Sequence, residues 1–543
     1  MGTRSHRRGD PPGIVAPYMA VSVTDNGVHT LLVHAPKMND DFEPLGPAMS
    51  ANYLAVGLPA LAAAIEQTGR SVEILHLGVQ ALVEPGFDLE AEVRRLRPTL
   101  VGLSLHWHAQ SWDTIQAAEA IKRGHPDAFV VLGGFTASVF PEEILQDHSC
   151  GDGVMRGDSD RPIVQLAHAL DGGEPLADVP NLVWRDADGI QTNSARWTAT
   201  AEDLIHLDYE RFDLVRHAPR YIRDFCGPVL LPHSRSRRVI MALGQRWFGG
   251  GDRTMILPIG RGCSVSCGWC GGGRGAHKAY QNRSGWTMLP PGRIAALIGR
   301  SVELGFKGVQ ACFDPTPKDP SVWVETFERV RDSNVRTGMF FESYAVPHAD
   351  LIASIAKTFP RRLISMSPES PNEAVRKRFR PLSFSNDQMV EAVRQCAAHN
   401  VDVLLCFGHG LPGESPDSLQ DIRRLVARCQ AAAKGIRLRH RSFSIEMEPG
   451  SPWANRPESY GIQLTRKTFA DYVAAHSPAA RGASCLGYTV DGYFDSTEDF
   501  AAQLHEAACK EMCPLPPSPR LGHLTCKVLR SLPGAGRSPH TRA

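Results

Sequence analysis

The sequence lacks any run of about 18 consecutive apolar residues, which is roughly what a transmembrane helix requires. Its first residues, MGTRSHRRGDPPG, also lack the apolar core of a signal peptide. An excess of charge of one sign is missing too, because 59 basic residues balance 58 acidic ones and leave a formal net charge of +1. We therefore expect a cytoplasmic protein that binds neither membranes nor nucleic acid and acts on a locally recognised substrate.

The 13 cysteines do not form a disulfide framework of the kind found in small secreted proteins. Most of them stand alone in apolar segments, where we expect small core residues. Examples are Cys312, Cys396, Cys406 and Cys429. Three others are clustered in the glycine-rich stretch GRGCSVSCGWCGGG, where Cys263, Cys267 and Cys270 have the spacing C-x3-C-x2-C. This cluster is the strongest candidate for chemistry.

Residues 28–172 alternate short apolar runs with amphipathic stretches. TLLVHAP, SVEILHL, TLVGLSLHW and AFVVLGG are typical of buried strands, and the stretches between them have helical periodicity. The alternation predicts an α/β domain with a doubly wound parallel sheet. Such sheets bind ligands beyond the carboxyl ends of their strands.

Residues 251–450 repeat this alternation in six strand–helix units. The pattern predicts a partial (β/α)6 barrel of the triose-isomerase type, in which functional residues follow the strands. The cysteine stretch comes directly after the first of these strands.

The other segments are less periodic. We interpret residues 173–250 as a connector with one hairpin at NLVWRDADGIQTN, and residues 451–513 as a region that covers the barrel mouth. Residues 1–17 and 514–543 are rich in Pro, Gly, Ser and Arg, so we expect disorder there.

Three clustered thiols indicate a particular kind of metal site. A structural zinc ion is normally closed by four ligands, but no second C-x2-C lies nearby, and His277 is separated from the cysteines by a glycine-rich run. Three cysteines on a 4Fe-4S cluster leave one iron open to bind a substrate or cofactor. The sequence therefore favours a catalytic iron–sulfur cluster over a structural zinc site.

This motif, with Trp269 directly before the third cysteine, resembles the radical S-adenosylmethionine (SAM) superfamily. The resemblance implies that the three cysteines bind a 4Fe-4S cluster whose open iron chelates SAM. It also implies SAM contacts at Ser367 and Glu369 in ISMSPES. The superfamily's Gly-Gly-Glu signature is absent, because GVQACFDP stands at the second strand end.

Further polar residues follow the second and third barrel strands. Asp314 lies in CFDPTP, and Glu342 and Tyr344 lie in FFESYAVP. We expect these side chains to orient a substrate or take a proton, although ordinary loop capping is an alternative for each.

The N-terminal domain resembles that of the cobalamin-dependent subgroup, through VVLGGFTASVFPEE and the following DGVMRGDSD. The resemblance implies that Gly133, Gly134 and Ser138 border the cobalamin tail, where glycine permits close approach of the backbone. A purely structural or nucleotide-binding sheet is the alternative.

The D-x-H-x-x-G motif that supplies a histidine to cobalt in methionine-synthase-like domains is absent, since His148 directly follows Asp147. The cobalt would then lack a protein imidazole on its lower face. His106, Trp107 or Arg70 are the candidates to approach that face.

Together these features resemble the cobalamin-dependent (class B) radical SAM methyltransferases, including the phosphinothricin-tripeptide P-methyltransferase and tryptophan 2-C-methyltransferase subgroups. The resemblance implies transfer of a methyl group from SAM through methylcobalamin to an unactivated carbon or a phosphinate phosphorus. The acceptor would be a small molecule or peptide of natural-product biosynthesis, and an electron donor such as flavodoxin or ferredoxin would be a partner. Alternatives are a cyclase or ring-rearranging enzyme that uses the same cofactors, and a non-catalytic sensor.

Overall fold

The computed structural model describes residues 27–37, 53–224, 226, 253–312, 314–414, 418–480 and 486–490. The two ends for which we expect disorder, residues 1–17 and 514–543, lie outside these ranges. Within the described ranges, no helix has the length and apolar character needed to cross a bilayer.

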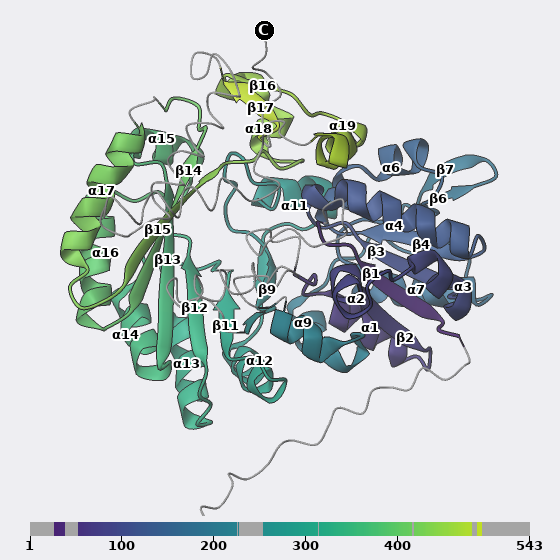
Figure 1. The fold of residues 1–543 in the computed structure, drawn as a ribbon, viewed down its shortest axis with the longest axis horizontal. Coiled ribbons are helices and arrows are strands. Elements are labelled where there is room, and N and C mark those ends of the chain that lie inside the picture. The colour runs from purple at the N-terminus through teal and green to yellow at the C-terminus, as the bar shows by residue number, and fades with distance from the viewer. Residues whose placement is uncertain are drawn as a thin grey trace, which may run out of the picture.

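The N-terminal domain is built on one seven-stranded sheet with helices packed against both faces (Figure 1). The strand order is β2-β1-β3-β4-β5-β6-β7, and the first five strands run parallel. These strands are Thr30–His34 (β1), Val72–His76 (β2), Leu100–Ser104 (β3), Phe129–Gly133 (β4) and Gly153–Met155 (β5). The helices are Leu58–Glu66 (α1), Leu77–Val83 (α2), Leu89–Leu96 (α3), Ser111–Gly124 (α4), Phe135–Val139 (α5), Pro141–Asp147 (α6) and Asp160–Leu170 (α7). The predicted doubly wound sheet is confirmed.

The central strands are apolar because both faces of the sheet are covered. Every residue of β1 is buried. Leu31 and Val33 pack in the cluster that contains α3 and α4, whereas Leu32 packs with Leu58 of α1 on the other face. Alternate residues of one strand thus serve two separate cores.

The hairpin at residues 182–192 corrects the interpretation of this segment as connector. Strand β6 (Leu182–Asp186) pairs antiparallel with β5, and β7 (Gly189–Thr192) pairs antiparallel with β6. The hairpin therefore extends the N-terminal sheet. The segment that follows contains the short helices α8 (Ala201–His206) and α9 (Ala218–Asp224).

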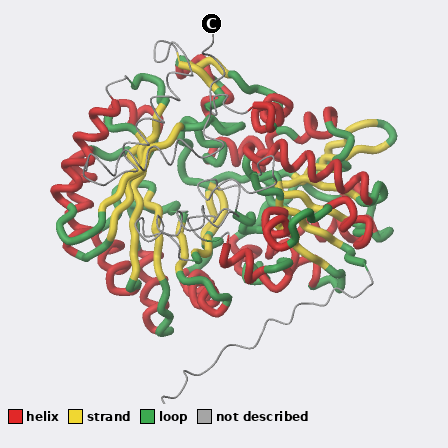
Figure 2. Tube along the Cα trace, viewed as in Figure 1, coloured by secondary structure: helices red, strands yellow, loops and turns green. Residues whose placement is uncertain are grey.

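The second domain is a curved sheet of six parallel strands in the order β15-β14-β13-β12-β11-β8. Figure 2 shows its helices on the outer face of the sheet. The strands are Thr254–Ile256 (β8), Gly308–Ala311 (β11), Gly338–Ser343 (β12), Arg361–Glu369 (β13), Asp402–His409 (β14) and Leu438–Ser444 (β15). The helices are Pro291–Glu303 (α12), Ser321–Asp332 (α13), Ala349–Thr358 (α14), Glu373–Phe379 (α15), Asn386–Ala398 (α16) and Ser418–Ala432 (α17). The expected partial barrel is confirmed.

The C-terminal region joins the two domains (Figure 1). Its elements are α18 (Pro452–Asn455), β16 (Ile462–Leu464), α19 (Phe469–His476) and β17 (Tyr488–Val490). Trp453 and Tyr488 pack with Phe379 on the barrel side. Phe469 and Tyr472 of α19 belong instead to a core cluster of the N-terminal domain. One short stretch of chain therefore contacts both domains.

Candidate functional site

The three clustered cysteines lie in a loop that follows β8. The loop runs from β9 (Gly260–Gly262) to α11 (Arg274–Gln281), and β9 pairs antiparallel with β10 (Trp286–Met288). We call residues 260–288 the cluster hairpin. It emerges from the carboxyl end of the first barrel strand, as the sequence predicts.

The thiols of Cys263, Cys267 and Cys270 lie close enough to influence one another electrostatically. Burial raises the pKa of Cys267 to about 12 and that of Cys270 well above its usual range. Metal binding would displace these thiol protons. The described residues contain no group of three or more Cys, His, Asp or Glu side chains gathered for a single metal ion. Three partly buried thiols in one loop are a donor set that suits an iron–sulfur cluster.

A segment far along the chain caps this loop. The Gly271 N–H donates to a carboxylate oxygen of Glu448 at 2.7 Å, and the Glu448 N–H donates to the carbonyl of Trp269 at 3.0 Å. Next to them, the Trp453 N–H donates to the Gly268 carbonyl at 2.9 Å. A β-carbon at position 268 would lie 2.4 Å from Nε1 of Trp453, so only glycine fits there. The stretch SIEMEPGSPWANRPESYGI, which contains Glu448 and Trp453, resembles the segment after the last barrel strand of the superfamily, but its contact with a loop so far back in the chain is not visible in the sequence.

Replacing Glu448 with alanine is expected to destabilise the protein by about 1–3 kcal/mol, since the Gly271 N–H then loses its acceptor in a buried setting. Denaturant unfolding of the full chain measures this loss. Glu458→Ala is the control, because Glu458 is an exposed carboxylate of the same C-terminal region. Equal stability of the two variants would contradict the capping role.

Glu369 and Arg380 form a buried ion pair beside the cysteine loop. Glu369 ends β13 with a left-handed φ of 55°, which is strained for a non-glycine residue. One of its carboxylate oxygens is buried without a hydrogen-bond partner among the described residues. Burial raises the pKa of Glu369 to about 7, and the guanidinium of Arg380 opposes that rise. An unsatisfied, strained carboxylate is typical of a functional position.

Three other predicted residues lie on or directly after β12 and β13: Glu342, Tyr344 and Ser367. Gln310 of β11 donates to Glu342 of β12 at 2.5 Å, and the Tyr344 hydroxyl donates to the carbonyl of Cys312 at 2.7 Å. Arg380 also donates to the Tyr344 carbonyl at 2.8 Å. Phe341 packs on Trp323 of α13, so Glu342 lies on the opposite, inner face of the sheet. The third, Ser367, is half-buried on β13.

Asp314 occupies a different setting from the one expected. It is 1% exposed and accepts a hydrogen bond from the indole of Trp323 at 3.1 Å. Trp323 is itself fully buried on α13. Asp314 therefore anchors the β11–α13 connection, and the expectation that it orients a substrate receives no support.

The protonation of Asp314 has a measurable consequence. Burial raises its pKa to about 6, above the ordinary aspartate value of 3.8, so the folded chain holds this proton more tightly than the unfolded chain. Stability due to this group is then fully present below about pH 4 and falls as the pH rises to about 6. Asp314→Asn should abolish this part of the pH dependence and leave the protein more stable than wild type at pH 7 by an amount on the order of 3 kcal/mol. Parallel pH-dependent unfolding curves for the two proteins would contradict it.

At the edge of the N-terminal sheet, the loop after β4 lies against the loop after β3. Gly134 has a φ of 115°, and a β-carbon there would lie 2.8 Å from Cα of His106. Gly133 is different, because its β-carbon would meet nothing closer than Met155 at 3.9 Å. The structure thus brings Gly133, Gly134 and His106 together at this edge, and a β-carbon at Gly133 would make only an ordinary contact.

Ser138 and Trp107 border the same edge. The Ser138 hydroxyl donates to the Gly134 carbonyl at 2.7 Å and accepts from the Gly157 N–H at 2.9 Å. The ring of Trp107 makes an edge contact with His106, at 4.7 Å between centroids. Burial lowers the pKa of His106 to about 4, so its imidazole is neutral at physiological pH.

One residue considered for the cobalt face, Arg70, and the histidine next to Asp147 both lie away from the ligand edge. Arg70 precedes β2, at the amino-terminal edge of the sheet, and its Nε donates to Asp171 at 2.8 Å. The ligand edge is the opposite one, so the structure contradicts a cofactor contact by Arg70. His148 ends α6, and its ring packs against Phe469 of α19 at 5.6 Å.

The edge of the N-terminal sheet directly contacts the cluster hairpin. His277 of α11 packs against Phe135 of α5 at 5.2 Å between ring centroids, and a β-carbon at Gly157 would lie 2.9 Å from the carbonyl of Gln281. The loops after β4 and β5 therefore abut the helix that follows the three cysteines. The two candidate cofactor regions share one boundary.

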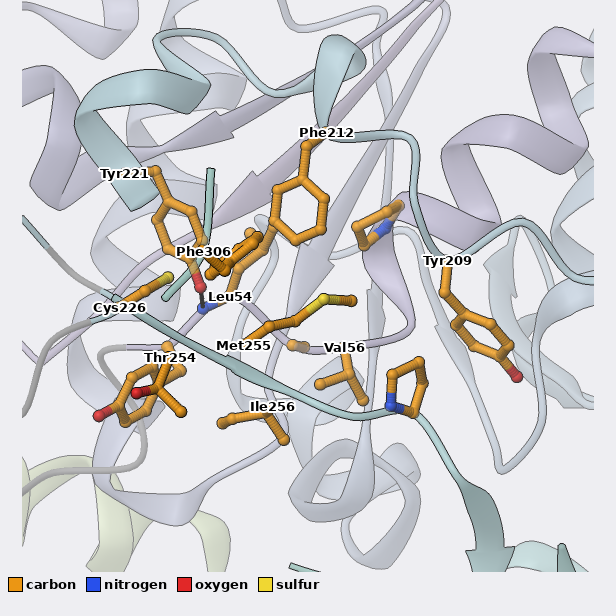
Figure 3. A pocket seen from close by; sticks show the side chains of 14 residues that line it. Leu54, Val56, Tyr209, Phe212, Tyr221, Cys226, Thr254, Met255, Ile256 and Phe306 are labelled. Atoms are coloured by element: carbon orange, nitrogen blue, oxygen red, sulfur yellow. Dashed lines mark hydrogen bonds between the residues drawn. The ribbon is translucent and has the colours of Figure 1, made fainter. Parts of the chain in front are cut away.

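A small pocket marks another part of the domain boundary (Figure 3). It is lined mainly by apolar and aromatic side chains, including Phe212, Tyr221 and Met255. The Tyr221 hydroxyl accepts from the Leu54 N–H at 2.8 Å. Its free interior of about 20 Å³ has room for a water molecule but not for a nucleoside.

Two protein-family models match the chain. The B12 binding domain model matches residues 50–167, and the Radical SAM superfamily model matches residues 257–426. The chain therefore carries a region that matches a B12 binding domain, followed by a region that matches the Radical SAM superfamily.

The fold has solved relatives with both domains. It matches TsrM, a radical SAM methyltransferase from Kitasatospora setae described with cobalamin and a 4Fe-4S cluster bound, with a TM-score of 0.61, 15% identity, and coverage of 90% of this chain and 91% of that one. It also matches the cobalamin-dependent SAM radical enzyme OxsB, with a TM-score of 0.58, 13% identity, and coverage of 93% and 71%. These likenesses establish the shared fold.

Curated relatives match over shorter spans. The hopanoid C-3 methylase of Methylococcus capsulatus is 27% identical over 136 residues, which is 25% of each chain. An uncharacterized methyltransferase of Pyrococcus horikoshii is 25% identical over 333 residues, 61% of this chain and 65% of that protein. The matches thus span less than two thirds of either relative.

Proposed function

We propose that the protein is a cobalamin-dependent radical SAM methyltransferase. It would transfer a methyl group from SAM, by way of cobalamin, to an unactivated carbon or a phosphinate phosphorus of a small molecule or peptide. The observation that carries the proposal is the direct packing of α11, which follows the three cysteines, against α5 at the ligand edge of the B12-binding domain. Methyl transfer between two cofactors requires that they face a common space.

The residues divide between the two domains in this proposal. Cys263, Cys267 and Cys270 would bind a 4Fe-4S cluster, and Gly133 with its neighbours would border cobalamin. When bound, the cluster would supply an electron for SAM cleavage and the cobalamin would carry the methyl group. The rings of Trp269 and Trp453, 5.8 Å apart, would help to shield the loop from water in this proposal.

Other side chains would hold SAM and the acceptor. The unpartnered oxygen of Glu369 would accept a hydrogen bond from SAM in this proposal, and Ser367, two residues earlier on β13, would be a second contact. Glu342 of β12 and Tyr344, whose carbonyl accepts a hydrogen bond from Arg380 at 2.8 Å, would orient the acceptor in this proposal. Burial raises the pKa of Glu342, which would favour a neutral carboxyl that can donate a hydrogen bond.

The test uses the full chain, reconstituted without oxygen with iron, sulfide and cobalamin, and supplied with methyl-labelled SAM and a reductant. We expect label on the cobalamin and release of S-adenosylhomocysteine, neither of which requires the acceptor. Deoxyadenosine formed without any methyl transfer would instead support the cyclase alternative. Bound cofactors with no consumption of SAM would support a sensor.

A further inference from the structure

Four charged side chains join the cluster hairpin to the B12-binding domain. Arg261 of β9 contacts Asp160 through both terminal nitrogens and Asp158 at 3.1 Å. Arg283, which follows α11, contacts Asp158 and donates to the Ala199 carbonyl at 2.9 Å. The Ala199 N–H in turn donates to Asp158 at 2.9 Å. We call Asp158, Asp160, Arg261 and Arg283 the interdomain quartet.

The interdomain quartet is shielded from solvent and balanced in charge. Asp158, Asp160 and Arg283 are 8%, 5% and 4% exposed, and the side chain of Arg261 is 20% exposed. Two carboxylates face two guanidinium groups. Buried ion pairs contribute little net stability compared with apolar packing, but a forked guanidinium–carboxylate contact fixes mutual orientation. The quartet is therefore better suited to fixing the orientation of the cluster hairpin on the N-terminal domain than to stabilising the fold.

The location of the quartet is informative. Arg261 lies two residues before Cys263, and Arg283 lies two residues after α11, so both ends of the cysteine-bearing segment are fixed. On the other domain, Asp158 directly follows Gly157, whose N–H donates to Ser138 beside the glycines after β4. A continuous set of contacts thus runs from the ligand edge of the sheet to both ends of the cysteine loop.

We propose that the interdomain quartet consists of positioning residues that set the distance and orientation between the iron–sulfur cluster and the cobalamin. This inference rests on the proposed function only in requiring that both cofactors bind. The planar fork of Arg261 on Asp160 fixes the direction of β9, and Arg283 fixes the end of α11. Without the contacts of the quartet, both cofactors would still bind, but the distance between the two cofactors would vary from molecule to molecule.

The test measures this separation directly. Protein loaded with both cofactors and reduced with dithionite contains cob(II)alamin and a reduced cluster, which are both paramagnetic. Their dipolar interaction in pulsed EPR falls steeply with distance, so a fixed geometry gives a well-defined interaction. We expect this in wild type. Arg261→Lys, which keeps the charge but loses the fork, and Asp160→Asn should lose the defined interaction while retaining iron and cobalamin.

Arg216→Lys is the matched control. Arg216 makes a similar forked contact with Glu73, but in the N-terminal domain away from the cluster hairpin. The Arg216→Lys variant should retain the dipolar interaction of the wild-type protein. A wild-type interaction in both quartet variants, or no defined interaction in wild type with both cofactors bound, would overturn the inference. Failure of wild type to bind a cofactor would overturn the proposed function instead.

Discussion

Cys267→Ala is expected to abolish the brown absorbance of the reconstituted protein, reduce bound iron to background and eliminate consumption of SAM. The reason is that a cluster held by three thiolates in one loop loses its geometry when one ligand is removed. The same result is expected for Cys263→Ala and Cys270→Ala. Iron analysis, EPR of the reduced cluster and chromatography of SAM products measure the effect.

Cys429→Ala is the matched control, because Cys429 is fully buried on α17 and removed from the cluster hairpin. It should retain iron and turnover. Cobalamin content should also be unchanged in the three loop variants, since the core cluster around β1, β3 and β4 contains no residue of the cluster hairpin. Retained iron in any of the three would contradict the cluster assignment.

Gly133→Val is expected to block cobalamin binding while leaving the cluster intact. A β-carbon at this glycine makes only an ordinary contact, with Met155 at 3.9 Å, so a side chain can begin there without a clash and its methyl groups would compete with the proposed cobalamin tail. Cobalamin content after reconstitution and gel filtration measures the loss. Iron content serves as an internal standard.

A substitution at Gly134 is expected to affect the stability of the domain, in contrast to a substitution at Gly133, which is expected to affect ligand binding. Because of its left-handed φ and its closeness to His106, Gly134→Ala should destabilise the domain itself by about 1–3 kcal/mol or more. The neutral control for Gly133→Val is Gly299→Val on the outer helix α12. A β-carbon at Gly299 makes only an ordinary contact with Val335. Normal cobalamin binding by Gly133→Val would show that the tail lies elsewhere.

The sequence predicts the architecture well because each element is encoded locally. The apolar run of β1 and the periodicity of α4 are readable within ten to fifteen residues, and parallel order follows from the alternation. The hairpin at 182–192 is equally readable as two strands. Its membership of the N-terminal sheet depends on pairing with β5, which no local pattern specifies.

In the candidate site, too, some features can be read from a short stretch of sequence and others depend on contacts between distant residues. The cysteine spacing is visible in one short stretch, whereas Glu448 reaches Gly271 across 177 positions. Arg70 precedes its strand, so it lies at the amino-terminal edge of the sheet, where its side chain contacts Asp171 and not the ligand edge. Asp314 follows β11 as expected, but its side chain turns toward Trp323, a choice that depends on tertiary packing.

The cap on the cysteine loop has a consequence for biogenesis. Residues 448 and 453 follow all six barrel strands, so a nascent chain that has just completed the loop has neither the carboxylate nor the indole that enclose it. Metallation during translation would meet an open, solvent-exposed set of thiols. The enclosed form arises only after nearly the whole described chain has left the ribosome, so a cluster inserted earlier would enter an open loop and one inserted later an enclosed loop.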